Sequence, residues 1–470
     1  MATKKPLNVT DESRSVPMTI FLLTWPVFVE QIFSTLVSFA DTAMVGSLGK
    51  EATAAISISN SPIFLLNGII MSLGIGITTM IGHAVGAGDE QRAKTLMRHT
   101  FLVLLYVGVP ITIIVASLSR MIPLWMGAGP DIIDKATKYN LIVSTGRIFM
   151  LASMILNSAF RGYGDTKTPM ILNIIMNMIN VIGNYLLINP TREITVLGVT
   201  FTMPGAGWGV EGAAAATALG MTVAGVMALY IAFRKTNPYR ISLSGKGALI
   251  PDKEITRQVF KISFPAMLER ICMSSSGIFV TSSIATLGTV SIAANSLFLS
   301  AESLSYMPAF AFQMAITTLV AQSLGAKKPD LAVKFLKWTM LMGTVIMAAT
   351  TVLLFVFASP LIGIFTPDQE VIELGAKCLQ IVALIQVPQM AAWVFGGLLR
   401  GAGDTKIIFY ITASTNWGIR TLFSVLVIRA FHMDLTATIW VMCIEILVRL
   451  VLLYLRYRSG KWKTIMEKNK

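Results

Sequence analysis

Asp41 is the acidic residue whose type and surroundings best suit the binding of a coupling ion. It lies near the end of a long apolar run and is followed by Thr42. A carboxylate with amide and hydroxyl oxygens suits a hard cation, whereas an isolated buried carboxylate can instead carry a proton. These residue types do not indicate whether the site binds a metal cation or a proton. The structural alternative is an interfacial acid at a helix end.

Amide side chains that could complete such a site recur in a second apolar segment. Asn173, Asn177, Asn180 and Asn184 are spaced by 4, 3 and 4 residues, which places them on one stripe of a helix. Within hydrocarbon, such a stripe must face polar partners or a cavity. Packing between helices is common for single asparagines, but four in register favour a polar cavity.

These side chains belong to a chain of 470 residues, of which 54% are hydrophobic and only 13% charged. Soluble proteins carry about 25% charged residues, so the composition indicates a membrane protein with many spans. Three distant cysteines and the lack of a His-rich or Ser/His/Asp constellation argue against a metal centre or an enzyme. A bilayer-spanning helix needs roughly 20 apolar residues. The hydrophobic runs predict an all-α integral membrane protein with twelve transmembrane helices, at about 17–40, 55–82, 100–119, 138–160, 169–189, 209–233, 257–286, 294–323, 335–358, 374–399, 407–430 and 434–456.

The basic residues are concentrated on one side of this twelve-span topology. With the N-terminus inside, the two termini and the even-to-odd connections hold 27 of the 38 Lys and Arg residues. This positive-inside bias explains the net charge of +14 without any nucleic-acid partner. We therefore expect both termini to be cytoplasmic.

The chain matches itself without a gap when it is shifted by 239 residues. Trp25-Pro26 falls on Phe264-Pro265, and the Arg-Gly-Tyr-Gly-Asp-Thr-Lys segment at 161–167 falls on a near copy at 400–406. Six spans in each half let both halves enter the membrane in the same direction, an arrangement used for alternating access. The predicted organisation is two pseudo-symmetric six-helix lobes, at 1–235 and 257–470, joined by a cytoplasmic linker at 236–256.

The repeat separates the intramembrane acids into symmetric and asymmetric ones. Glu30 lies eleven residues, about three helical turns, before Asp41, and its repeat counterpart is Glu269. The counterpart of Asp41 is Val280, so Asp41 breaks the symmetry. Because charges in the membrane are costly unless they are functional, all three are possible coupling acids. Glu30 and Glu269, being symmetric, are expected to stabilise the bend between the lobes.

The repeated Arg-Gly-x-Gly-Asp-Thr-Lys segments are expected to be structural turns. Their glycines allow a tight reversal, and the aspartate can cap the next helix. The spacing of a phosphate-binding loop is absent. Energy for transport is therefore expected from an ion gradient rather than from ATP.

A resemblance to a known family rests on Pro26, the Asp41-Thr42-x-Met44-Val45-Gly46 stretch, Gly86-Ala87-Gly88 and the paired Arg-Gly turns. In these residues, and in its twelve spans arranged as two six-helix halves, the chain resembles the MATE (multidrug and toxic compound extrusion) transporters. The resemblance implies a V-shaped bundle that exports small organic, often cationic, compounds in exchange for Na⁺ or H⁺, with no other cofactor. We also expect a monomer in the lipid bilayer of a bacterial or archaeal cytoplasmic (inner) membrane.

The resemblance also assigns roles to individual residues. Asp41 matches the family's coupling acid in the first span. Asn180 and Asn184 match its polar pair in the fifth span, so these three residues would bind Na⁺ if that is the coupling ion. Tyr139 and Thr217 fit the remaining polar positions of the site. Pro26 matches the proline at which the first helix of some members bends.

The C-terminal half departs from the NorM-like branch of the family. Gln389 stands where that branch has an acid, eleven residues before the second Arg-Gly turn. Glu269 leaves one acid in this half, and Glu302 could pair with Arg270 or line a C-terminal cavity. The resemblance therefore favours a mechanism in the N-terminal lobe, closer to the DinF-like branch.

The expected function is a cation-coupled antiporter that exports amphipathic organic cations or drugs. The alternative is a flippase or exporter of a lipid-linked or bulky metabolite precursor. A flippase of anionic precursors needs a cavity rich in basic residues, for which Arg147 and Arg420 are the obvious candidates. The sequence does not identify the substrate.

Overall fold

The computed structural model describes residue 9 and residues 14–196, 199–244 and 248–468 of the chain. Nearly all of these residues are helical, as the long apolar runs predict. In chain order the elements are α1 (Val16–Gly46), α2 (Lys50–Gly86), α3 (Glu90–Val103), α4 (Val109–Ser117), α5 (Met121–Trp125), α6 (Pro130–Gly162), α7 (Lys167–Leu187), β1 (Pro190–Val196), β2 (Val199–Ala206), α8 (Gly209–Phe233), α9 (Lys253–Ile284), α10 (Thr289–Gly325), α11 (Pro329–Val356), α12 (Ala358–Gly363), α13 (Gln369–Ala383), α14 (Gln386–Gly401), α15 (Thr405–Thr415), α16 (Leu422–Arg429), α17 (Leu435–Arg458) and α18 (Ile465–Lys468).

The expected twelve-helix arrangement is confirmed. Among the described residues, nine helices are long and apolar enough to cross a membrane, and α13 with α14 forms a further span bent by 56°. The two remaining predicted spans, 257–286 and 407–430, correspond to α9 and to the α15–α16 helix, whose two parts are joined by a π-helical turn at Asn416–Thr421. A similar turn at Leu104–Gly108 joins α3 to α4.

One element departs from the all-α expectation. The connection between α7 and α8 is an antiparallel hairpin, β1–β2, paired from Pro190 with Ala206 to Val196 with Val199. Its two strands contain four threonines, two valines and one isoleucine, residues that favour strands because their branched side chains fit a pleated surface.

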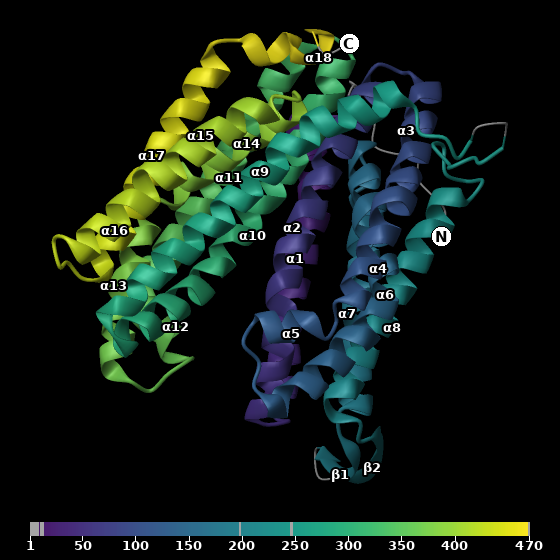
Figure 1. The fold of residues 1–470 in the computed structure, drawn as a ribbon. Coiled ribbons are helices and arrows are strands. Elements are labelled where there is room, and N and C mark those ends of the chain that lie inside the picture. Colours follow the sequence, from purple (N-terminus) through teal and green to yellow (C-terminus); the bar gives the residue numbers. More distant parts are fainter. Residues whose placement is uncertain (1–8, 10–13, 197–198, 245–247, 469–470) are drawn as a thin grey trace.

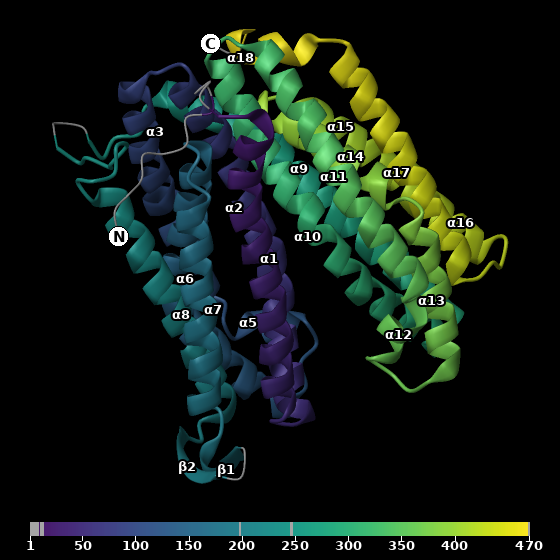
Figure 2. The ribbon, with the colours of Figure 1, turned by 180° about the vertical axis from the view of Figure 1, so that it is seen from behind.

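The two halves of the chain form two bundles that diverge from each other, as seen from both sides of the molecule (Figure 1, Figure 2). One bundle contains α1–α8 and the other α9–α17. They approach each other at the end where α3 and α18 lie, and separate toward the end that carries α5, α12 and the hairpin. We call the first the basic end, because Arg92, Lys261, Lys327 and Lys463 line one hollow there, and the second the splayed end.

The bundles are hydrogen-bonded to each other at the basic end by contacts that follow the internal repeat. Each contact has a counterpart in which both partners are shifted by 239 residues, so the interface is pseudo-twofold symmetric. The contacts are Thr79 Oγ1 with the Arg400 carbonyl (2.9 Å), Thr318 Oγ1 with the Arg161 carbonyl (3.0 Å), His83 Nε2 with the Gly401 carbonyl (3.0 Å) and Gln322 Nε2 with the Gly162 carbonyl (3.0 Å).

Glycines allow α2 and α10 to approach closely at this end. A Cβ added at Gly86 would overlap the backbone carbonyl of Gln322. The counterpart position, Gly325, stands in the same relation to the carbonyl of His83. The two glycines occupy equivalent positions of the repeat, and both allow the same close crossing of α2 and α10.

Replacing Gly86 with alanine should weaken the crossing, because the added methyl group has no room unless α2 and α10 move apart. Overpacking of this kind costs about 1–3 kcal/mol, so we expect a lower unfolding temperature of the purified protein. Gly46→Ala is the matched control, since a Cβ there meets no atom within 4 Å. Equal unfolding temperatures for the two variants would contradict the assignment.

Candidate ion-coupling site

The polar residues of the N-terminal bundle lie along the contact between α1 and α7. The two helices run in the same direction, and three side-chain contacts join residues that are 143 positions apart. Asn173 Nδ2 donates to Glu30 at 2.7 Å, and Asn184 Nδ2 donates to the Asp41 carboxylate. Between them, Asn177 Nδ2 lies 3.4 Å from the Ser34 hydroxyl. The constant offset means that the eleven-residue spacing of the two acids matches the spacing of the amides that contact them.

Asp41, Asn184, Asn180 and Thr217 form one connected cluster. Asn184 Nδ2 lies 3.3 Å from Asn180 Oδ1, and Asn180 Nδ2 donates to Thr217 Oγ1 on α8 at 2.9 Å. Asp41 is half-buried, whereas Asn184 has no exposed surface. The structure thus brings together four of the five residues that were predicted to couple an ion.

The orientation of the Asn184 amide leaves one oxygen of this cluster without a donor. Nδ2 faces two acceptors, the Asp41 carboxylate and Asn180 Oδ1, which fixes the amide nitrogen on that side. Asn184 Oδ1 is buried and has no hydrogen-bond partner among the described residues. A buried acceptor that lacks a donor costs free energy, so this oxygen is available to a cation or to a proton donor. The donor set fits either ion.

Tyr139, the fifth predicted residue, lies beside this cluster on α6. Its side chain is 5% exposed, close enough to Asp41 for an electrostatic interaction, and its hydroxyl bonds to the side chain of Asn60 on α2. Asn60 was not identified from the sequence. A single asparagine in a Ser-rich stretch gives no periodic signal.

Only part of the asparagine stripe fits the expectation of a polar cavity. Asn173 and Asn177 bond to α1 residues and therefore fit the alternative of interhelical packing. Asn180 and Asn184 differ because they surround a half-buried carboxylate. The expectation of a polar cavity thus applies only to the part of the stripe nearest the splayed end.

The symmetric acids are paired with the arginines of the repeated turns, which sequence reasoning missed. Arg161 Nη2 contacts both oxygens of Glu30, at 2.7 and 2.9 Å. Arg400 Nη2 contacts Glu269 at 2.8 Å, and Thr412 takes the place of Asn173 at 3.3 Å. These residue pairs carry the same 239-residue offset as the repeat itself, and that offset was the signal that could have revealed them.

The two Arg-Gly turns have the expected tight reversals, with Gly164 and Gly403 at φ of 90° and 80°. The expected helix cap is present in only one of them. Asp165 accepts the N–H groups of Lys167 and Thr168, at 3.1 and 2.9 Å. Asp404 makes no side-chain cap and instead pairs with Arg456 of α17 at 2.7 Å.

The predicted residues of the C-terminal bundle do not join this cluster. Glu302 is fully buried on α10, with Tyr306 and Arg420 as its charged or polar neighbours. Arg270 instead lies against Gly68 of α2, in the other bundle. Of the two alternatives for Glu302, pairing with Arg270 is therefore not the arrangement seen. Gln389 is buried on α14.

Pro26 lies inside α1, which continues as one helix from Val16 to Gly46. Proline removes a backbone hydrogen bond inside a helix. The helix therefore has one weakened position about one turn before Glu30.

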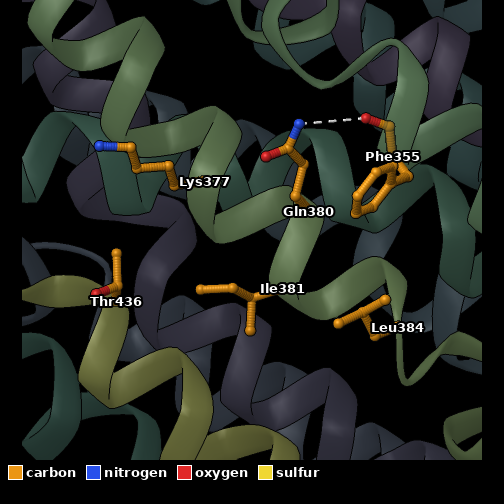
Figure 3. A pocket seen from close by; sticks show the side chains of 6 residues that line it. All are labelled: Phe355, Lys377, Gln380, Ile381, Leu384 and Thr436. Carbon is orange, nitrogen blue, oxygen red and sulfur yellow. Dashed lines mark hydrogen bonds between the residues drawn. The ribbon is translucent and has the colours of Figure 1, made fainter.

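A second hollow, of about 310 Å³, lies in the C-terminal bundle and is separate from the Asp41 cluster. Figure 3 shows its lining residues, among which Gln380 Nε2 lies 3.4 Å from the Phe355 carbonyl and Lys377 is the only charged side chain. None of the predicted site residues lines it.

Comparison with known proteins agrees with this architecture. The MatE family model matches residues 26–186 and 265–426, and the two matches begin 239 residues apart. The "Probable multidrug resistance protein NorM" of Thermotoga maritima is 25% identical over 454 residues, covering 96% of this chain and 94% of that protein. The "Uncharacterized transporter YisQ" of Bacillus subtilis is 25% identical over 463 residues, covering 98% and 97%.

Solved structures share the fold. One is described as an outward-facing conformation of a multidrug resistance MATE family transporter, and it superposes with a TM-score of 0.86 at 21% identity over 99% of this chain and 100% of that one. A MOP superfamily transporter from Pyrococcus furiosus gives 0.86 at 21% identity, over 98% and 99%. With two family matches that span both bundles, the chain belongs to the MatE family and is a multi-pass membrane transporter, not an enzyme.

Proposed function

We propose that this transporter exports amphipathic organic cations in exchange for H⁺ or Na⁺, with Asp41 as the coupling acid. Asn180 and Asn184 supply amide groups to the same site, and Thr217 and Tyr139 border it. The relatives named as multidrug resistance proteins support the export of organic compounds. The cluster suits both H⁺ and Na⁺.

The observation that carries this proposal is the buried Asn184 Oδ1, which has no donor among the described residues and lies beside a half-buried carboxylate. A cation bound there would be attracted by the Asp41 charge and would satisfy the orphaned oxygen. A proton on Asp41 would remove the charge and provide a donor. Either event changes the charge of the N-terminal bundle, which is what coupling requires.

The shape of the molecule supports alternating access as the transport mechanism. The bundles are joined at the basic end and diverge at the other end (Figure 1). If the positive-inside rule holds, the basic end and both termini lie in the cytoplasm, and this conformation is open to the outside. We propose that the lobes at 1–235 and 257–470 exchange this arrangement for an inward-open one, as a monomer in a bacterial or archaeal cytoplasmic membrane.

We place the coupling in the N-terminal lobe, as in the DinF-like branch, for a chemical reason. Gln389 is neutral, and Glu269 already has a charged partner in Arg400, at 2.8 Å. Asp41 has only an amide as its hydrogen-bond donor among the described residues. A carboxylate without a fixed counter-charge is the better place to exchange an ion.

The alternative of a flippase for anionic precursors has less support. Arg147, one of its two candidate cavity residues, is only 1% exposed and lies near Tyr139 on the same helix. A guanidinium that is buried inside one bundle does not present its charge to a substrate between the bundles.

The coupling ion can be identified with the purified protein in proteoliposomes. Efflux of ethidium should be measured under an imposed Na⁺ gradient at equal pH and, separately, under a pH gradient without Na⁺. Efflux that accelerates under at least one gradient supports the antiporter. Equal efflux with and without either gradient would show that transport is not coupled to these ions.

A further inference from the structure

A hollow of about 140 Å³ lies between the two bundles at the basic end. Its wall is formed by α2 and α3 of the N-terminal bundle, and by α9, α10 and the C-terminal segment of the other one. Ligand pockets for drug-sized molecules are about 300–1,000 Å³, so this hollow is too small for the transported compounds. Its charged or titratable lining residues are His83, Asp89, Arg92, Lys261, Lys327 and Lys463.

Four of these residues are cations and one is an acid, and they come from separate segments of the chain. Arg92 Nη2 bonds to the neutral amide oxygen of Gln258 at 3.1 Å. The acid, Asp89, is already used as the N-cap of α3, where it accepts the Arg92 N–H at 2.9 Å. Lys327 is one of two non-glycine residues with a positive φ in the described chain, at 57°. The fold therefore brings dispersed positive charges to one small hollow.

The internal repeat provides a comparison, because the interface is pseudo-twofold symmetric. The counterparts of Arg92, Lys261 and Lys327 are Leu331, Leu22 and Gly88, none of which is charged. On the matching side of the interface, Val9 is buried against the other bundle. Its N–H group lies 3.3 Å from Gln322 Oε1, the counterpart of His83, and its side chain joins an apolar cluster with Leu23, Leu319 and Leu331. The charges of Arg92, Lys261 and Lys327 thus have no charged counterpart on the matching side, where Lys328 stands at the position equivalent to Asp89.

We propose that this hollow binds a phosphate-type anion, either inorganic phosphate or the phosphomonoester headgroup of an anionic lipid. Several cations around a space of a few water volumes suit a compact, doubly charged anion. The cytoplasmic ends of membrane helices are also where basic pockets between helices meet lipid headgroups. This site is independent of the Asp41 cluster and of the substrate.

Binding at this hollow has a consequence for the conformational equilibrium. Both bundles contribute to its wall, so the complete set of cations exists only while the bundles are joined at the basic end. An anion that binds only this arrangement shifts the population toward it. Phosphate therefore stabilises the conformation that is closed at the basic end.

The test uses the full-length protein and a pair of variants designed from the repeat. Arg92→Leu and Lys327→Gly introduce the residues that the counterpart positions already carry, and glycine also accepts the positive φ at 327. Lys334→Gln is the matched control, because Lys334 is an exposed cation on α11 and does not line the hollow. Inorganic phosphate is titrated calorimetrically at constant ionic strength against chloride, and phosphatidic acid is supplied in nanodiscs of phosphatidylcholine.

Each removed charge should weaken phosphate binding about fivefold, because a basic residue near a membrane surface contributes about 1 kcal/mol to the binding of an anion. The control should bind as the unmodified protein does. Spin labels at positions 50 and 369, at the splayed end of each bundle, should remain far apart when phosphate or phosphatidic acid is present and populate shorter distances without it. A response to phosphatidic acid alone identifies a lipid headgroup, and a response to phosphate alone a soluble anion.

Two results would overturn the proposal. One is the absence of any binding of either probe to the unmodified protein. The other is equal binding by the control and by the double variant, which combines Arg92→Leu with Lys327→Gly. Unfolding temperatures of the variants, measured without phosphate, separate a lost site from a damaged fold, and Lys261→Gln provides an additional variant if the double variant is unstable.

Discussion

Replacing Asp41 with asparagine should reduce ion-driven export of ethidium to the rate of protein-free liposomes. The substitution keeps the size of the side chain and removes the only charge in the cluster with Asn184, Asn180 and Thr217. Without that charge, a cation loses its main attraction and no carboxylate remains to take up a proton. The effect is expected on the ion dependence of transport, measured in proteoliposomes under an imposed gradient.

Abundance and stability must be separated from coupling in this experiment. Glu211→Gln is the matched control, because Glu211 is an exposed acid of the same bundle that pairs with Lys138 at 2.8 Å. It should export at the unmodified rate. Export at the wild-type rate by a well-folded Asp41→Asn protein would show that Asp41 is not the coupling acid.

Replacing Glu269 with glutamine should mainly lower stability. The carboxylate is 8% exposed and the Arg400 side chain that contacts it is 15% exposed. Breaking a buried ion pair by removing one partner costs about 3–5 kcal/mol, because the other charge is left unpaired. The free energy of unfolding in detergent should fall accordingly, while the dependence of export on Na⁺ or pH should keep its midpoint.

A second substitution distinguishes a structural ion pair from a coupling acid. Arg400→Met in the Glu269→Gln background removes the unpaired charge and should recover part of the lost stability. Glu373→Gln, at an exposed acid on α13 that bonds to Gln369, should leave stability unchanged. A shifted ion dependence with unchanged stability in Glu269→Gln would move coupling into the C-terminal bundle.

Much of the fold could be predicted because membrane spans and repeats leave direct signals in sequence. Apolar runs of bilayer length gave the twelve helices, and the gap-free offset of 239 gave two equivalent halves. The β1–β2 hairpin was missed, since it lies in a short connection between two apolar runs. The π-helical turns were missed because they do not interrupt the hydrophobic pattern.

The site was partly predictable for a different reason. The spacing of Asn173, Asn177, Asn180 and Asn184 fixed a helix face. Asp41 was indicated by its residue type, by the lack of an acid at its repeat counterpart Val280, and by the resemblance. The partner helix could not be deduced from that face alone, because a stripe can contact any neighbour. The α1–α7 register, with its 143-residue offset, and the pairing of Glu30 with Arg161 required the tertiary structure.

The most direct test of Asp41 as the coupling acid is to drive the ion with the substrate. Proteoliposomes are loaded with ethidium and diluted, and the movement of ²²Na⁺ or of protons, reported by a pH-sensitive dye, is followed without any imposed ion gradient. The unmodified protein should move one of these ions against the direction of ethidium, and the Asp41→Asn protein should move neither. Ion movement of unchanged extent in the Asp41→Asn protein would contradict the account.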